Sequence, residues 1–128
     1  MPRPTILACH LTDARMSKLR LLCMRLGLLI KPVTEADFTQ PLSVLSGLEA
    51  PGEALPAEGS VEEELLVFCH MPDSAVSRFL QLARQQRIPP FALKAVLTPT
   101  NAAWTLPRLF RELAEEREAL RQGSNAHE

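Results

Sequence analysis

Two Cys-His pairs are the side chains of this sequence whose types could bind a metal ion. Cys9 and His10 end one apolar run, and Cys69 and His70 end another. Two thiolates and two imidazoles form a ligand set that suits zinc. Adjacent residues of a strand point to opposite faces, so a single pair cannot hold one ion while the chain stays extended. If a two-fold axis along the strands relates the two halves, equivalent residues also point to opposite faces. The pairs that share a face are then Cys9 with His70 and Cys69 with His10.

The alternative for these four residues is structural. A free cysteine is usually a small buried hydrophobe, and a histidine can cover a strand end while it hydrogen-bonds to loop backbone. We therefore predict no cofactor, and zinc is the ion that would fit if one were bound. A cysteine-dependent enzyme would need Cys9 or Cys69 exposed beside a base and an orienting group. The sequence shows no complete set of this kind, so we do not expect catalysis.

A polar loop after the last apolar run could hold a ligand. In "LTPTNAAWTL" at 97–106, hydroxyl and amide side chains stand close to an aromatic ring just before a helix. Such a cluster at a helix start suits a carboxylate, a phosphate or another small ligand. Together with the two histidines, the candidate ligand-binding residues are Thr98, Thr100, Asn101, Trp104, His10 and His70.

Most of this loop also has a structural explanation. Thr105 is placed to cap the helix that follows, and Trp104 is placed to pack on Leu109 as a hydrophobic staple. Asn101 and Pro99 are typical turn residues. Thr98, Thr100 and Asn101 have no counterpart in the first half of the chain, so these three residues are where we expect a function of the loop.

Self-similarity of the two halves predicts the elements that position these side chains. "ILACHLTDARMSKL" at 6–19 resembles "LVFCHMPDSAVSRF" at 66–79 with an offset of 60, and the likeness continues through Lys31 and Lys94 with an offset of 63. Unbroken apolar runs are typical of strands covered on both faces, and the helix-period stripes between them are typical of helices packed on a sheet. The pattern predicts two copies of a strand, helix, strand, helix unit.

Two such units predict a small α/β fold. Right-handed crossovers favour a four-stranded parallel, doubly wound (flavodoxin-like) sheet of order 2-1-3-4, with the first helix on one face and the third on the other. Lys31, Lys94 and Pro32 are expected on edge strands, which must not recruit another strand. A ligand crevice would then lie at the carboxyl ends of strands 1 and 3, beside the Cys-His pairs.

Local residues predict where the helices begin and end. Asp13 and Asp73 fall in or just before the first turns of their helices, where a carboxylate meets free backbone N–H groups. Gly27 is expected to end the first helix as a C-cap. The basic residues of that helix, Arg15, Lys18, Arg20 and Arg25, are expected on its solvated face.

Length and charge predict a single domain. The 128 residues suffice for one core, over 1–121, with half-repeats 5–47 and 65–121. An acidic linker at 48–64, with six acids and no base, is expected to be a mobile surface segment, and 122–128 a disordered tail. The net charge of -1 disfavours nucleic acid and anionic membranes as partners. Three free cysteines and the absence of a signal peptide or an apolar span favour the cytoplasm.

Part of the sequence invites comparison with receiver domains. "LVFCHMPD" followed by "AVLTPT" is similar to the third and fourth strands of that fold. The phosphoacceptor aspartate would fall near Phe68, and Cys9 and His10 replace the metal-binding acidic pair. The resemblance therefore does not extend to phosphorelay activity.

The run "LKAVLTPTNAAWTLPRLFREL" resembles a small bacterial family, domain of unknown function 3783. The resemblance covers about residues 65–118 well and the first half more loosely. It implies a small soluble protein and supplies no activity, cofactor or catalytic residue. The family pattern at the third strand end is more often Cys-Gly than Cys-His.

Two functions follow as expectations. The first is a non-enzymatic interaction or regulatory module that acts through a helix face, a sheet edge or self-association with a protein partner. The second is a small-ligand (anion) or metal-binding protein that uses the expected crevice, with Cys9, His10, Cys69 and His70 as the metal ligands.

Overall fold

The computed structural model describes residues 2–56 and 58–126, and its elements alternate between strands and helices. In chain order they are β1 (Thr5–Cys9), α1 (Asp13–Leu26), β2 (Leu29–Val33), η1 (Glu35–Asp37), α2 (Leu42–Leu45), β3 (Leu65–Cys69), α3 (Asp73–Gln85), β4 (Leu93–Val96), η2 (Asn101–Ala103) and α4 (Leu106–Ala126). η1 and η2 are single turns of 3₁₀ helix.

The sheet has the predicted order, β2-β1-β3-β4, and the predicted edge strands are confirmed. β1 pairs with β2 and β3 with β4 in parallel. β1 and β3 are antiparallel, with Thr5 opposite Cys69 and Cys9 opposite Leu65. The expectation of an all-parallel, flavodoxin-like sheet is therefore wrong, because the sheet is mixed.

β3 begins at the end of the sheet where β2 finishes. A parallel β3 would need the chain to travel back along the whole sheet before the strand begins, roughly 17 Å for a five-residue strand. Neither α2, which rises by only about 6 Å, nor the segment 46–64 makes this return. Leu65 therefore pairs with Cys9, whose partner on the other side is Val33 at the end of β2.

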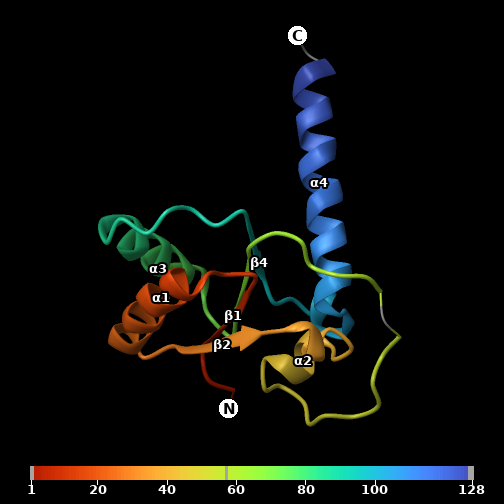
Figure 1. The fold of residues 1–128 in the computed structure, drawn as a ribbon, viewed down its shortest axis with the longest axis horizontal. Helices are drawn as coiled ribbons and strands as arrows, with labels where there is room; N and C mark the ends of the chain where they lie inside the picture. Colours follow the sequence, from red (N-terminus) through yellow and green to blue (C-terminus); the bar gives the residue numbers. More distant parts are fainter. Residues whose placement is uncertain (1, 57, 127–128) are drawn as a thin grey trace.

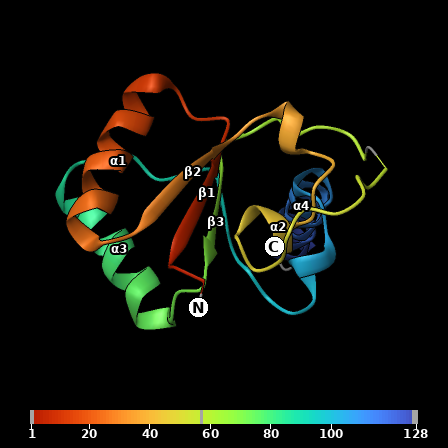
Figure 2. The same cartoon turned by 90° about the horizontal axis from the view of Figure 1, so that it is seen from below.

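The helices form two layers, one on each face of the sheet (Figures 1 and 2). α1 and α3 pack on the face that carries Ile6 and Phe68, whereas α2 and α4 pack on the face of Leu7 and Val67. The expectation that α1 and α3 lie on opposite faces is wrong. β1 and β3 are antiparallel, and the connections that follow them lead in opposite directions across the sheet, to β2 and to β4. Because both connections are right-handed, α1 and α3 lie on the same face.

The predicted helix ends are confirmed where local chemistry determines them. Asp13 and Asp73 are the first residues of α1 and α3. Thr12 caps α1 by accepting a hydrogen bond from Arg15 N. Gly27 ends α1 with φ +70°, a left-handed conformation that glycine adopts at little cost.

The acidic segment 48–64 is attached to the body at several points. Val61 is buried in the core between the sheet and α4, so the segment does not lie wholly at the surface as the sequence predicted. Glu63 receives two hydrogen bonds from Arg117, at 3.0 and 2.6 Å. Arg15 Nε lies 2.6 Å from Glu64 Oε2. The expectation that Arg15 belongs to a solvated helix face is therefore wrong.

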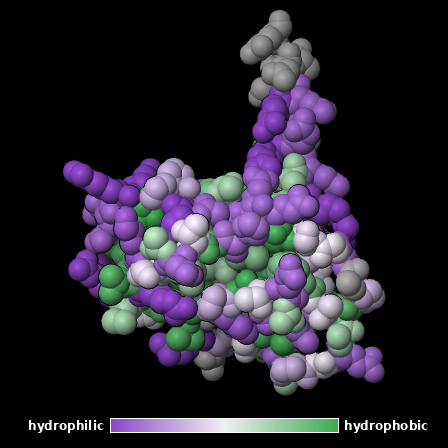
Figure 3. Space-filling model, in the orientation of Figure 1, coloured by the Kyte–Doolittle hydropathy of each residue, from purple (hydrophilic) through white to green (hydrophobic). Residues whose placement is uncertain are grey.

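α4 is longer than the body it packs on, and its C-terminal half projects away from it (Figure 1). The projecting part is mostly hydrophilic (Figure 3), and Leu120 is 74% exposed. The helix continues to Ala126, and the rest of the expected tail, 127–128, lies outside the described residues. Within the described chain, neither α4 nor any other helix is long and apolar enough to cross a membrane.

Candidate functional site

The two Cys-His pairs lie at opposite ends of the sheet. Since Cys9 pairs with Leu65 and Cys69 with Thr5, the two cysteines are four residues apart along the strands, roughly 13 Å. The expected crevice at shared carboxyl ends of β1 and β3 does not form, because these ends point in opposite directions. Within residues 2–56 and 58–126, no three His, Cys, Asp or Glu side chains are grouped to hold a metal ion.

The predicted same-face pairs are not brought together either. Cys9 and Cys69 point to one face and pack in the same core, that of α2 and α4. The two-fold relation expected along the strands would have placed them on opposite faces. An axis perpendicular to the sheet, as antiparallel central strands require, leaves corresponding residues on the same face.

Burial makes all three cysteines poor nucleophiles. Burial raises the pKa of Cys9 and Cys23 to about 11 and that of Cys69 to about 12, from an ordinary value of 9.0. For Cys9, the Asp37 carboxylate adds a smaller contribution in the same direction. The neutral thiol is thus favoured at physiological pH, whereas nucleophilic catalysis requires the thiolate.

We expect the native protein to resist alkylation at these thiols. Because the folded pKa values lie above the unfolded ones, the thiols stay neutral up to about pH 11, and their burial stabilises the fold fully only below pH 9. At pH 8, iodoacetamide should label the protein in urea much faster than the native protein, as followed by intact mass. Rapid native labelling of Cys9 or Cys69 would contradict this assignment.

His10 and His70 share an unusual backbone conformation. Their φ angles are +67° and +60°, in the left-handed region that favours glycine. His70 Nε2 donates to the Ser46 carbonyl at 3.2 Å, as the structural alternative for this residue predicts, whereas the side chain of His10 is exposed. A Cys-Gly sequence at such a strand end would adopt the same turn at lower cost. The two histidines lie at opposite ends of the sheet and belong to no common site.

The polar loop that follows β4 and contains Thr98 and Thr100 is closed by hydrogen bonds between its own residues. Asn101 Oδ1 accepts from Thr98 N at 2.9 Å, and Asn101 Nδ2 donates to the Val96 carbonyl at 3.0 Å. Thr98 Oγ1 accepts from Asn101 N at 3.1 Å, and Ala102 N donates to the Thr98 carbonyl. Asn101 is 7% exposed, so its amide stabilises the loop rather than facing a ligand.

The helix start after the loop is built as predicted. Thr105 Oγ1 accepts from Arg108 N at 3.4 Å and caps α4. Trp104 packs against the core that contains Leu109. The guanidinium of Arg108 covers the indole at 4.5 Å from the ring centroid, a cation–π contact.

A hollow of about 340 Å³ lies beside this loop, on the α4 face of β4. We call it the α4-side hollow, and its lining is Ala95, Val96, Thr98, Thr100, Asn101, Trp104, Leu109, Glu112, Leu113 and Glu116. Four sequence-predicted ligand residues therefore lie around one hollow. Its two carboxylates and its lack of a lining cation disfavour the anion that the loop suggested. The lining suits an apolar or basic side chain instead.

The outer edge of β4 is open next to this hollow. Leu93 N donates to the Glu64 carbonyl and Leu97 N to the Phe68 carbonyl, both toward β3. Because backbone groups alternate along a strand, those of Lys94 and Val96 point away from the sheet. The Val96 carbonyl is occupied by Asn101, which leaves Val96 N–H and both backbone groups of Lys94 facing outward.

The other edge of the sheet, β2, is closed. Leu29 N donates to the Pro4 carbonyl, so the residues of β2 that face outward are Ile30 and Pro32. Proline has no N–H to donate, and it prevents strand addition at this edge. β4 has Val96, 38% exposed, at the last outward position, and no proline.

The sequence comparison predicted that Lys31 and Lys94 occupy equivalent positions on the two edge strands, and this prediction is wrong. Lys31 lies beside Leu7 on the α2 and α4 face, whereas Lys94 lies beside Leu66 on the α1 and α3 face. The true correspondence between β2 and β4 has an offset of 64, and it sets Pro32 against Val96. The signal for an open edge was therefore present in the sequence, as a proline in "LIKPV" and none in "LKAVL".

In the comparisons with known proteins, one family model matches the same region. Residues 64–120 match the family model described as Domain of unknown function (DUF3783), which confirms the resemblance predicted for the C-terminal half. The matched segment contains β3, α3, β4 and most of α4, and with them the whole lining of the α4-side hollow. No curated protein and no solved structure matched the chain.

Proposed function

We propose that this chain, whose family-matched segment contains β4 and the helices that flank it, is a non-enzymatic interaction module. It binds an extended segment of a protein partner by strand addition along the outer edge of β4. The observation that carries the proposal is the outward N–H of Val96, at the position where the other edge strand has Pro32. In the complex, Lys94 N and Val96 N donate to the added strand, and the Lys94 carbonyl accepts from it.

Side chains must add to these backbone contacts. Three hydrogen bonds contribute about 0.5–1.5 kcal/mol each, whereas micromolar affinity needs about 8 kcal/mol. Burial of roughly 200 Å² of apolar surface supplies about 5 kcal/mol before the cost of association. The α4-side hollow supplies part of this surface in the half-buried Trp104 and Leu113, and the rest must come from a large apolar or basic side chain of the partner that fills it.

The substitution Val96→Pro tests the proposal. It removes one outward donor and leaves the ladder to β3 intact, so peptide binding should fall at least tenfold, roughly the contribution of one lost hydrogen bond plus a steric clash. The probe is a phage-displayed library of random linear peptides selected on the wild-type protein, and affinities are then measured by isothermal titration calorimetry. Thermal unfolding should show little change, because prolines are tolerated at sheet edges.

The chain offers a matched control in Pro32→Val, which restores a donor at the β2 edge and should leave peptide affinity unchanged. Single N-methylation along a selected peptide gives a second readout that leaves the protein unaltered. Strand addition predicts that methylation weakens binding at every second residue only. Equal binding by wild type and Val96→Pro, with no alternation in the methylation scan, would disprove strand addition at β4.

A further inference from the structure

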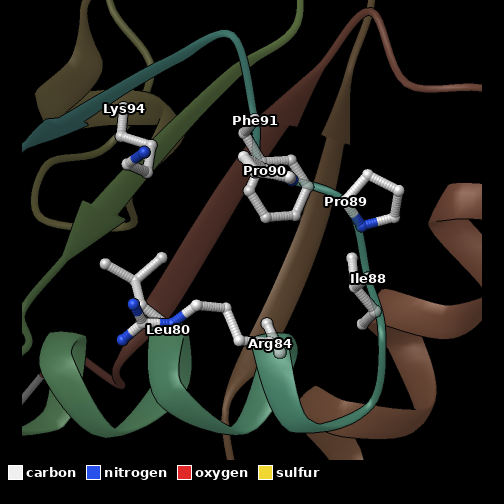
Figure 4. Close-up of a pocket in the computed structure, with 8 residues that line it drawn as sticks. Leu80, Arg84, Ile88, Pro89, Pro90, Phe91 and Lys94 are labelled. Atoms are coloured by element: carbon white, nitrogen blue, oxygen red, sulfur yellow. The ribbon is translucent and has the colours of Figure 1, made fainter.

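A second hollow lies beside β4, on the opposite face of the sheet (Figure 4). We call it the α3-side hollow; it measures about 260 Å³ and is lined by Leu80, Ala83, Arg84, Ile88, Pro89, Pro90, Phe91 and Lys94. Most of the lining is apolar, and the two polar side chains are both cations. Lys94 extends from β4 and Arg84 from α3, while the segment 88–91 closes the other side (Figure 4).

The two cations of this hollow lack a carboxylate partner. No hydrogen bond or ion pair involves the side chain of Arg84 or Lys94 among the residues that the structure describes. The lining contains no Asp or Glu. Two unpaired cations at the rim of an apolar hollow favour a ligand that carries a carboxylate on an apolar stem.

The wall of the hollow is held in place from behind by Arg15. Its guanidinium donates to the carbonyls of Pro89 and Pro90, at 3.1 and 3.3 Å, and lies 4.8 Å from the centroid of the Phe91 ring. The ion pair with Glu64 fixes Arg15 in turn. A wall fixed in this way costs a ligand little ordering, so the hollow is formed before binding.

The position of Lys94 links this hollow to the edge of β4. Lys94 is one of the two outward-facing residues of the strand, and its side chain points to the α1 and α3 face, as does that of its register partner Leu66. A residue paired with Lys94 on an added strand projects its side chain to the same face. That side chain meets the Lys94 ammonium and the rim of the α3-side hollow.

We propose that the partner segment carries an aspartate or glutamate at the position beside Lys94, with its carboxylate held between Lys94 and Arg84. This inference rests on the proposed strand addition and specifies its partner. The residues on either side of this acid along the added strand project to the other face of the sheet, where Glu112 and Glu116 repel acids. The site therefore selects an alternation, with acid on the α3 face and apolar or basic residues on the α4 face.

The test uses peptides selected on the full chain and assays them against Arg84→Gln and Lys94→Gln. Each variant should weaken binding about tenfold, the effect of one charge-assisted contact, and the double variant should lose the preference for the acidic peptide over its glutamine counterpart. Arg78→Gln, another exposed arginine of α3 outside the hollow, is the matched control and should bind normally. Because Arg84 and Lys94 are exposed, thermal unfolding should be unchanged in these variants.

A charge exchange separates this inference from the proposal on which it rests. Arg84→Glu with Lys94→Glu should bind a peptide with lysine in place of the acid and reject the original peptide. Binding that Val96→Pro removes but neither Arg84→Gln nor Lys94→Gln affects would overturn this inference alone. Binding that needs Arg84 and Lys94 but is equal in Val96→Pro would overturn strand addition and leave a carboxylate site.

Discussion

Replacing Phe79 with alanine is expected to lower the free energy of unfolding by about 3–5 kcal/mol, the usual cost of deleting a buried ring. Phe79 is 0% exposed and attaches α3 to the sheet through Phe68, with the ring centroids 5.6 Å apart and the planes at 65°. The substitution loses the buried surface and the edge-to-face contact, and it leaves a cavity. Urea unfolding followed by circular dichroism measures the effect.

Phe79→Leu is the matched control for this prediction. Leucine keeps most of the apolar volume and fits a helix, so its cost should be clearly smaller than that of alanine. A loss below about 1 kcal/mol for Phe79→Ala would contradict the packing of α3 on the sheet, since surface substitutions usually stay within about 0.5 kcal/mol.

Asn101→Ala is expected to cost about 1–3 kcal/mol, because it removes two hydrogen bonds that a buried side chain makes to the loop backbone. The amide of Asn101 satisfies Thr98 N–H and the Val96 carbonyl, and both bonds are lost together. The same urea experiment applies, with Thr100→Ala as the control in the same loop. Thr100 is exposed, so its truncation should change the free energy of unfolding by no more than about 0.5 kcal/mol.

The two loop variants also separate structure from ligand contact. If Asn101→Ala is as stable as the wild type, the hydrogen bonds that close the loop contribute little, and Asn101 becomes available for a ligand. If it is destabilised as expected, Asn101 supports the edge of β4 by holding the Val96 carbonyl. Peptide affinity of Thr100→Ala then shows whether the exposed rim of the α4-side hollow touches the partner.

Local chemistry made much of the fold predictable from the sequence. Gly27 ends α1 because glycine accepts a left-handed φ, and Asp13 and Asp73 begin helices because carboxylates favour free N–H groups. The strand order followed from the tendency of short, right-handed connections to join neighbouring strands of a sheet. These features depend on neighbours in sequence, which a single chain reveals.

The direction of β3 could not be predicted in the same way. The runs at 65–69 and 6–9 look alike whichever way they pair, because side-chain alternation is the same in both directions. The deciding feature was the path of residues 46–64, which stay at the end where β2 finishes, so that Leu65 pairs with Cys9. That single reversal separated His10 from His70 and removed the expected crevice.

The candidate site was predicted in part. Thr98, Thr100, Asn101 and Trp104 do line one hollow, although the carboxylates of Glu112 and Glu116, from distant positions on α4, change the ligand it suits. Arg84 and Lys94 were not predicted to act together, because nine residues, which include the connection 86–92, separate them in sequence. Only packing of α3 against β4 brings their side chains to one hollow.

Amide hydrogen exchange of β4, measured by NMR on the free protein and on the complex with a selected peptide, tests strand addition most directly. In the free protein, the N–H groups of Lys94 and Val96 face solvent and should exchange fast, whereas that of Ala95 faces β3 and should be protected. The complex should show strong new protection at Lys94 and Val96 and little change at Ile30 of the β2 edge. Binding that leaves Lys94 and Val96 exchanging as fast as before would contradict strand addition at this edge.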